Sequence, residues 1–322
     1  MQDHGPVYVQ ERHGERRHGT MQDVINFYKL GQTSRVNAIV GQCTVDPHEV
    51  DGPNKHLLVT HQLLRHTDKP IMSWPVATIG ENEKVFKMIE MVMGEGYLAS
   101  HYFVTASVCA LSYAQESADT IIAYARANQP VTVLTAPMTG VSTPISDIGA
   151  LVAQNAELLA GIVLAQLVQP GVPVIYGTAT YAADMRSGAF ITGSPLSNLI
   201  DRAALQLAQS LYHMPTRTLA GNTDAKVPDI QAGYETMQNY IQLLMGGTHM
   251  INECLGILDG MMTVSYEKYI IDEEMLRRVG CMMRGLDTSE ASFDMSVLLE
   301  TPHMEPFLMH ESTLAACSGQ WQ

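Results

Sequence analysis

The sequence predicts a (β/α)₈ barrel, and three observations support this fold. Short apolar runs recur along the chain, and each is followed by a longer segment with helical periodicity. The runs begin roughly 30 to 40 residues apart, which is the repeat of a βα unit. The 322 residues exceed the roughly 250 that eight such units need. An open doubly wound sheet is the alternative, but no G-x-G-x-x-G turn follows a strand.

Seven apolar runs are expected to form parallel strands buried on both faces, because they are almost continuously apolar or β-branched. They are Val36–Val40, Pro70–Trp74, Tyr102–Ala106, Val131–Ala136, Pro173–Tyr176, Thr216–Ala220 and His249–Ile251. The first unit, within residues 1–35, is weaker and combines a polar strand at Pro6–Gln10 with a helix at Met21–Leu30. Residues 36–285 carry the clear units of a single barrel domain, and residues 286–322 form a C-terminal extension.

Between these strands, apolar side chains at helical spacing predict helices that turn this stripe toward the core. Two such stripes are Ile148, Val152, Leu159 and Val163, and Ile230, Tyr234, Met237, Ile241 and Leu244. Two dipeptides, Thr143-Pro144 and Ser194-Pro195, are typical of an N-cap residue followed by proline in the first helical turn.

The composition excludes some functions. The formal charge is 19 − 33 = −14, which argues against a protein that binds nucleic-acid backbones. Five scattered cysteines without a C-x-x-C pair are typical of a reducing compartment. No apolar signal segment opens the chain, and polar residues interrupt the apolar stretch Ile148–Val168. A cytoplasmic protein that does not enter a membrane is therefore expected.

In such a barrel the active site lies at the carboxyl ends of the strands. Two loops there are unusually long, Tyr176–Gly193 and Asn252–Ser265. No P-loop, H-E-x-x-H, G-x-S-x-G or zinc-binding spacing is present, so no metal site is expected. A metal-dependent lyase or hydrolase is an alternative that would need three converging ligands. Otherwise a cofactor or partner supplies the difficult chemistry.

Three segments carry a resemblance to a known family. PVIYGTATYAADMRSGAFITGSP, LAGNTDAKVPDIQAGYE and VSYEKYIIDEEML, with HMEPFLMHESTL near the end, resemble the trimethylamine methyltransferase family of corrinoid-dependent (β/α)₈ barrels. Relative to this family the chain looks shortened at both ends. The resemblance implies methyl transfer from a methylated amine to the cobalt of a separate small corrinoid protein. The corrinoid would be carried by that partner, with none bound permanently, and a homo-oligomer is the family's habit.

The trimethylamine enzymes carry pyrrolysine at a position that we match to Asn222. An ordinary asparagine there resembles the non-pyrrolysine branch, which includes glycine betaine methyltransferases. A quaternary ammonium leaves as a neutral amine, so the protein need only position it and exclude water. Neutral trimethylamine must first be activated, which asparagine cannot do. Trimethylamine or another methylated amine as donor, or a relative that binds without catalysis, are the alternatives.

Placement at the barrel mouth and the resemblance together select the candidate residues. The expected catalytic residues are Asn222, His249 and Asp224. The expected substrate-binding residues are Trp74, Tyr176, Tyr181, Asp184, Arg186 and Glu253. Aromatic faces and carboxylates suit a quaternary ammonium, and Arg186 or His249 would hold a substrate carboxylate. Ordinary structural roles remain open: turns for Asn222 and Asp224, packing for the tyrosines, and a mutual ion pair for Asp184 and Arg186.

Overall fold

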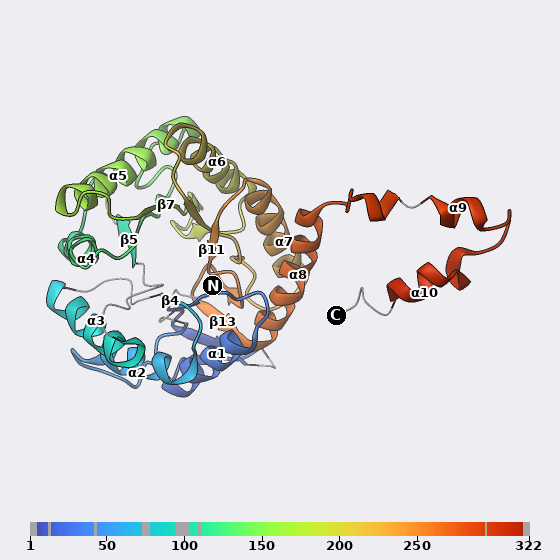
Figure 1. The fold of residues 1–322 in the computed structure, drawn as a ribbon. Coiled ribbons are helices and arrows are strands. Elements are labelled where there is room, and N and C mark those ends of the chain that lie inside the picture. Colours follow the sequence, from blue (N-terminus) through green and yellow to red (C-terminus); the bar gives the residue numbers. More distant parts are fainter. Residues whose placement is uncertain are drawn as a thin grey trace. The chain divides into compact units, whose positions relative to one another are not determined.

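The structure, a computed structural model, describes residues 5–11, 14–41, 44–72, 78–94, 103–107, 111–293 and 295–317. The chain divides into two compact units, residues 1–280 and 281–322. The first unit is a barrel, in which a ring of helices surrounds short parallel strands (Figure 1). The second unit begins five residues earlier than the extension expected from the sequence, since 286 − 281 = 5.

The helices of the ring follow one another around the barrel in chain order (Figure 1). They are α1 (Met21–Thr33), α2 (Lys55–His66), α3 (Ile79–Met93), α4 (Gln115–Arg126), α5 (Asp147–Val168), α6 (Pro195–Gln206), α7 (Ile230–Met245) and α8 (Tyr266–Arg284). A π-helical turn, η1 (Leu207–Leu211), continues α6. The second unit contains η2 (Glu290–Phe293), α9 (Ser296–Glu300), η3 (Phe307–Met309) and α10 (Glu311–Cys317).

Parallel strands line the inside of the ring. Five of them pair in the spatial order β11 (Met250–Asn252), β10 (Thr216–Leu219), β7 (Val174–Thr178), β6 (Val131–Thr135) and β5 (Phe103–Ser107). Two more, β3 (Val40–Gly41) and β4 (Ile71–Met72), pair in parallel beside them. Each of the seven expected runs therefore contains a strand or the start of one, and the barrel prediction is confirmed.

The first strand, β1 (Tyr8–Gln10), forms where it was expected but belongs to a separate small sheet. It pairs in parallel with β13 (Thr263–Ser265) and antiparallel with β2 (Arg16–His18), while β12 (Ile257–Leu258) pairs antiparallel with β13. The long loop after β11 thus returns to cover the N-terminal strand.

Successive side chains of a strand point to opposite faces of the sheet, so the strands separate two apolar cores. Val131, Val133 and Tyr176 point outward into the core between strands and helices. Leu134 and Leu219 point inward and share the barrel interior with Met72, Ala179 and Tyr181.

One of the two predicted helix starts needs correction. Ser194 is the N-cap of α6 and Pro195 follows it, as expected. The helix α5, however, begins at Asp147 and not after Thr143. The chain first makes a tight turn in which Gly140, at φ +83°, donates to the carbonyl of Thr143.

The apolar stripes of α5 and α7 do not all face the core. Ile148 and Val152 lie on the solvent side of α5, and Tyr234 is 59% exposed on α7. The buried face of α5 includes small and polar residues such as Ala150, Gln154 and Gly161. Because α5 carries apolar residues on both sides, periodicity alone could not identify the buried one.

Behind the mouth of the barrel, Asp201 of α6 anchors the chain that leaves β7. Its carboxylate accepts hydrogen bonds from the hydroxyls of Thr178 and Thr180 and from the backbone N–H of Thr180 at 3.0 Å. Burial raises the pKa of Asp201 to about 6, although these hydrogen bonds oppose the shift.

This pKa predicts how stability depends on pH. The folded protein holds the Asp201 proton up to about pH 6, whereas the unfolded chain releases it near the usual value of 3.8. The stability contributed by this group is therefore present below about pH 4 and is lost as the pH rises through 6, by about 3 kcal/mol in total. We expect Asp201→Asn to gain that amount relative to wild type between pH 4 and 7, measured by urea unfolding. A difference that does not change with pH would contradict the assignment.

Candidate active site at the carboxyl ends of the strands

The loops after β10 and β11 approach each other so closely that one position admits only glycine. A Cβ atom on Gly221 would lie 2.2 Å from the carbonyl oxygen of Glu253 and 2.5 Å from the Cα of Cys254. No side chain fits at such distances, so the backbone of one loop rests directly on the other. The two loops therefore present their next residues as one surface.

Asn222 and Glu253 meet on this surface. The Asn222 Nδ2 atom donates to Glu253 Oε2 at 3.3 Å, and the two side chains are 2% and 1% exposed. Within the described part of the chain, Asn222 Oδ1 has no hydrogen-bond partner. Glu253 has φ +47°, a left-handed conformation that is strained for a non-glycine residue and is concentrated at functional sites.

A buried ion pair on α8 supports both loops. Lys268 Nζ lies 2.6 Å from Asp272 Oδ2, and their side chains are 1% and 0% exposed. The ammonium also donates to the carbonyl of Gly221 at 3.2 Å, while the Asp272 carboxylate accepts from the backbone N–H of Gly256 at 2.7 Å. One pair thus holds the β10 loop through its cation and the β11 loop through its anion.

The pKa values of the two groups are displaced by the same cause. Burial lowers the pKa of Lys268 and raises that of Asp272, and in each case the opposite charge of the partner counteracts the effect.

Asparagine and tyrosine side chains complete the support. Asn239 of α7 donates to the carbonyl of Asn222 at 2.9 Å and accepts from Asn198 of α6 at 2.6 Å. The Tyr240 hydroxyl donates to the carbonyl of Cys254. Adjacent helices of the ring therefore fix the backbone on either side of the Asn222–Glu253 contact.

Asp224 joins the β10 loop to the hairpin formed by β8 (Ala182–Ala183) and β9 (Phe190–Ile191). Its carboxylate accepts from the N–H groups of Thr192 and Gly193 at 2.8 and 3.1 Å. Glu235 performs a similar task from α7, accepting from the Thr223 hydroxyl at 2.5 Å and the Asp224 N–H at 2.9 Å. These contacts give Asp224 a positioning function, and Glu235 was missed by sequence reasoning because its neighbour Tyr234 was assigned to the core.

Tyr181 lies on the interior side of the mouth. It packs with Leu219 and Met72 in the interior core and stacks edge-on against Phe190 at 5.3 Å. Backbone hydrogen bonds to the residues after β6 hold it there: its N–H donates to Pro137, and its carbonyl accepts from Thr139.

A second interior residue, Arg217, was missed by sequence reasoning. It lies two residues before Leu219 on β10, so both point into the barrel, and it is 1% exposed. A buried arginine in the middle of a strand is rare, and this rarity is the signal that the sequence offered.

The remaining candidates are not brought together with Asn222. Tyr176 points outward and donates to Asn155 of α5 at 2.9 Å. His249 is exposed at the amino ends of the strands, where its Nδ1 accepts from the N–H of Thr216 at 3.2 Å, so it lies at the edge opposite to the mouth. Arg186 is exposed and Asp184 is half-buried on the β8–β9 turn, where Asp184 accepts from the Arg186 N–H. Trp74 lies outside the described residues.

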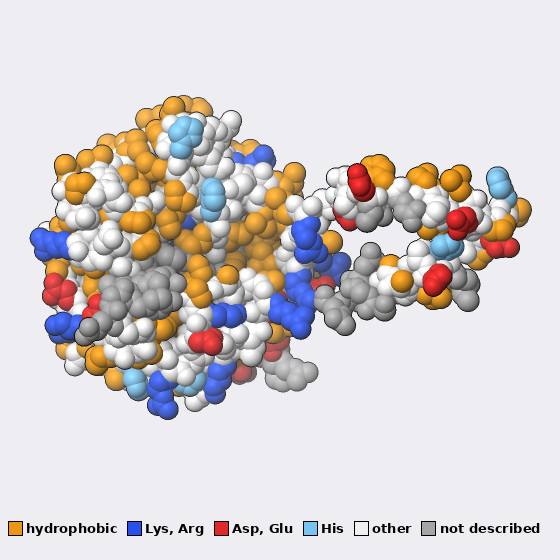
Figure 2. Space-filling model, in the orientation of Figure 1, with side chains coloured by type: hydrophobic (Ala, Val, Ile, Leu, Met, Phe, Trp, Pro, Cys, Tyr) orange, Lys and Arg blue, Asp and Glu red, His pale blue; other side chains and the backbone are white. Residues whose placement is uncertain are grey.

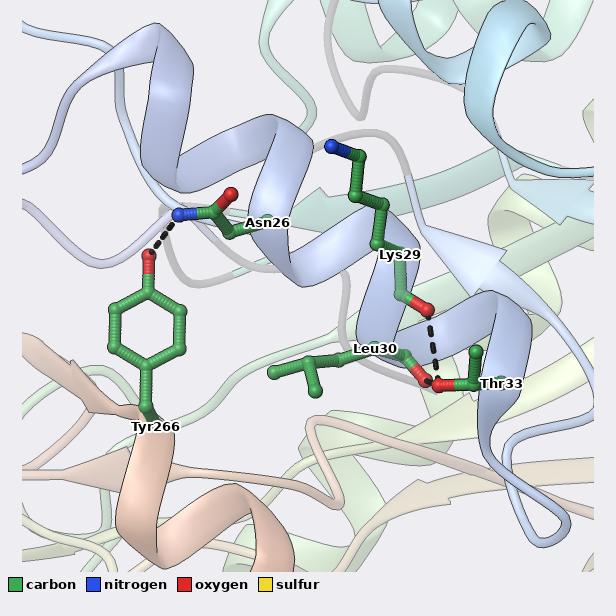
Figure 3. Close-up of a pocket in the computed structure, with 5 residues that line it drawn as sticks. All are labelled: Asn26, Lys29, Leu30, Thr33 and Tyr266. Carbon is green, nitrogen blue, oxygen red and sulfur yellow. Dashed lines mark hydrogen bonds between the residues drawn. The ribbon is translucent and has the colours of Figure 1, made fainter.

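A hollow of about 500 Å³ on the outer surface lies between α1 and the start of α8. Figure 3 shows its lining by Asn26, Lys29, Leu30, Thr33 and Tyr266, with Asn26 donating to the Tyr266 hydroxyl at 3.2 Å. It shares no residue with the mouth. Among the described residues, no group of three or more His, Cys, Asp or Glu side chains is arranged to hold a metal ion.

Fold and site define a barrel protein whose polar centre lies at the carboxyl ends of its strands. The chain matches the trimethylamine methyltransferase family model over residues 1–321 and belongs to that family. Its fold is similar to that in the crystal structure of the hydroxylamine MtmB complex, with a TM-score of 0.60 over 89% of this chain and 66% of that chain, at 8% identity.

Three relatives show where the chain stands within the family. It is 32% identical to glycine betaine methyltransferase of Desulfitobacterium hafniense (strain Y51), over 97% of this chain and 66% of the relative. It is 33% identical to proline betaine:corrinoid methyltransferase of Eubacterium limosum, over 89% and 61%. It is 34% identical to trimethylamine methyltransferase MttB of Methanosarcina barkeri, over 83% and 52%. The chain therefore spans between about half and two thirds of the length of these relatives.

Loss of the buried ion pair should destabilise the barrel. Lys268→Met leaves Asp272 buried without its cation, and we expect a loss of about 3–5 kcal/mol in the free energy of unfolding, measured with urea. Arg278→Met is the matched control on the same helix, because Arg278 and Glu274 form an exposed pair at the same spacing. That change should cost about 0–1 kcal/mol. Equal losses in the two variants would show that the buried pair has no special role.

Proposed function

We propose that the protein transfers a methyl group from a quaternary amine, of the glycine betaine type, to the cobalt of a corrinoid protein. Family membership and the names of two relatives, which act on glycine betaine and proline betaine, support this activity. The observation that carries the proposal is the buried contact between Asn222 and Glu253 at the mouth. The proposal includes a cytoplasmic location, supported by the free thiols of Cys281 and Cys317.

The residues at the mouth suit a donor that is already positively charged. In the reaction the carbon–nitrogen bond breaks, and the nitrogen keeps its electron pair and leaves as a neutral tertiary amine. The corrinoid supplies the electron pair of the new bond to the methyl carbon. No proton is transferred, so the protein requires no acid, and the Asn222 amide is sufficient as a neutral positioning group.

Recognition of the donor divides between two ends of the site. The Glu253 carboxylate and the Tyr181 ring would stabilise the quaternary ammonium, which has no N–H group to donate. The carboxylate of a betaine would bind Arg217, whose guanidinium offers a planar pair of donors inside the barrel. This assignment replaces Arg186, which lies on an exposed turn, and His249, which is exposed beyond the amino ends of the strands. Arg217 pairs with the residue after His249, but its side chain is buried and points into the barrel interior.

Spectroscopy of the acceptor tests the activity directly. The chain is mixed with reduced cob(I)alamin and glycine betaine, and the methylcobalamin spectrum is followed, with trimethylamine in a parallel sample. We expect methylation of the acceptor in the sample with glycine betaine and none in the sample with trimethylamine. The variant Glu253→Gln should lower kcat/KM for glycine betaine at least tenfold, because it removes the charge that faces the ammonium.

The other outcomes select the alternatives. Methylation by trimethylamine would show that Asn222 does not restrict the donor. Binding of betaine in calorimetry without methylation, with either cob(I)alamin or a corrinoid protein as acceptor, would indicate a non-catalytic relative.

Arg217→Lys should separate the two ends of the donor. A lysine cannot reproduce a bidentate contact with a carboxylate, so we expect KM for glycine betaine to rise roughly tenfold or more. Tetramethylammonium, which has no carboxylate, should react equally well with wild type and variant. Arg186→Lys is the matched control and should change neither donor. An equal effect of Arg217→Lys on both donors would indicate a structural role for Arg217.

A further inference from the structure

The outward face of α5 is apolar along its whole length. After Asp147, every exposed residue of this helix is apolar. They are Ile148, Val152, Ala156, Ala160, Val163 and Leu167, with Ile148 71% and Leu167 77% exposed. Figure 2 shows hydrophobic side chains along the edge of the molecule over α5 and α6. An apolar face of this length on a barrel's outer helix indicates a surface covered by another molecule.

The opposite face of α5 is already occupied by the barrel. Leu158, Ile162 and Ala165 pack into the main core, and α5 lies between α4 and α6. Polar groups on its inner side are bonded as well: Gln154 donates to the Thr178 hydroxyl at 2.8 Å, and Glu157 accepts from the Leu111 N–H at 2.8 Å.

Among the described residues, α5 is also the helix long and apolar enough to cross a membrane. Crossing would break these inner contacts and expose a carboxylate to lipid, which is costly. The outer face therefore fits a protein partner.

The order of side chains on this face identifies the partner. From one end to the other it reads large, large, small, small, large, large. If two copies of the helix lie antiparallel, Ile148 faces Leu167, Val152 faces Val163, and Ala156 faces Ala160. Such a pattern is complementary to itself under a two-fold axis, as an isologous contact requires. A contact with an unrelated protein would not require a symmetric order of side chains on this face.

We propose that α5 packs antiparallel against α5 of a second copy of this chain, with the two-fold axis near Leu158. The alanines at the centre let the two backbones approach, and the larger side chains close the ends. Copies that each carry a charge of −14 repel one another, so contact is favoured where charge is lacking, and beyond Asp147 this face has none.

The available area is sufficient for a dimer. A helix of 22 residues is roughly 33 Å long. A groove of about 460 Å³ beside it, lined by Leu151, Leu207 and Leu211 among others, extends the apolar surface toward α6. Together with α6 and η1, which have 12 and 5 residues, the surface offers on the order of 600 Å² per copy, about three quarters of the roughly 800 Å² of a standard interface.

Sedimentation velocity on the full chain tests the proposal. Wild type should dimerise at micromolar concentrations, and Ala160→Glu should raise the dissociation constant at least 100-fold. Met91→Glu is the matched control, because Met91 is an exposed residue of α3, 77% exposed, and this change should leave the dimer intact. Mixing the Ala156→Lys and Ala160→Glu chains should restore dimers to within tenfold of wild type, since the lysine of one copy then faces the glutamate of the other.

Three results would contradict the proposed dimer. The first is a wild-type protein that remains monomeric at about 100 μM. The dimer could survive Ala160→Glu, or the mixed chains could fail to recover although each is folded by circular dichroism. Monomeric wild type that floats with phosphatidylcholine vesicles, while Ala160→Glu does not, would assign the face to a membrane instead. If Ala160→Glu does not fold, Val152→Glu applies the same test at a second exposed position, with Val163→Lys as its pairing partner.

Discussion

The buried pair of Lys268 and Asp272 is the interaction on which the mouth of the barrel depends. Neither side chain reaches water, and burial disfavours the charged form of each. Each charge is therefore tolerated only while the other is close and the remaining hydrogen bonds are made. One of those bonds goes to the Thr236 hydroxyl of α7, and the others go to the Gly221 carbonyl and the Gly256 N–H, in the two loops that carry Asn222 and Glu253. Both charges lie on α8, so a displacement of either loop would leave a buried charge without one of its hydrogen bonds. That energetic cost holds the two loops in place at the site.

This arrangement explains how strain at Glu253 is maintained. A left-handed backbone at a non-glycine residue costs on the order of 1–3 kcal/mol and persists only where its surroundings determine it. The contact of Gly221 with the Glu253 carbonyl and the bond from Tyr240 to the next carbonyl supply that determination. The Glu253 carboxylate is consequently directed at Asn222 before any ligand arrives, which is the preorganisation that the proposed positioning of a donor needs.

The sequence was sufficient for the architecture but only partly for the site. The run Val131–Ala136 predicted β6 because continuous β-branched runs are typical of buried parallel strands. Asn222 was selected because it follows such a run and because the family resemblance covers it. His249 was expected at the carboxyl ends of the strands, but it directly precedes its strand and therefore lies at the amino ends. Tyr176 was misplaced because its direction depends on parity along β7, which an uninterrupted apolar run does not reveal. Arg217 was overlooked because the run around it was assigned as a strand and the single charge inside that run was not considered.

The same limitation explains α5, where a helix apolar on both faces was assigned one buried stripe. For most outer helices the polar face identifies solvent, but on α5 the polar residues Gln154 and Glu157 serve the barrel and the exposed residues are aliphatic. Placing aliphatic residues on the outer face of α5 is favourable only if another molecule covers that face and excludes water. The location of α5 on the outside of the ring has a further consequence. A second copy bound there would cover a flank of the barrel and leave the carboxyl ends of the strands open, so the large methyl acceptor of the proposed reaction could approach Asn222 and Glu253 in each copy. The proposed dimer and the proposed methyl transfer therefore make no competing demand on the same surface.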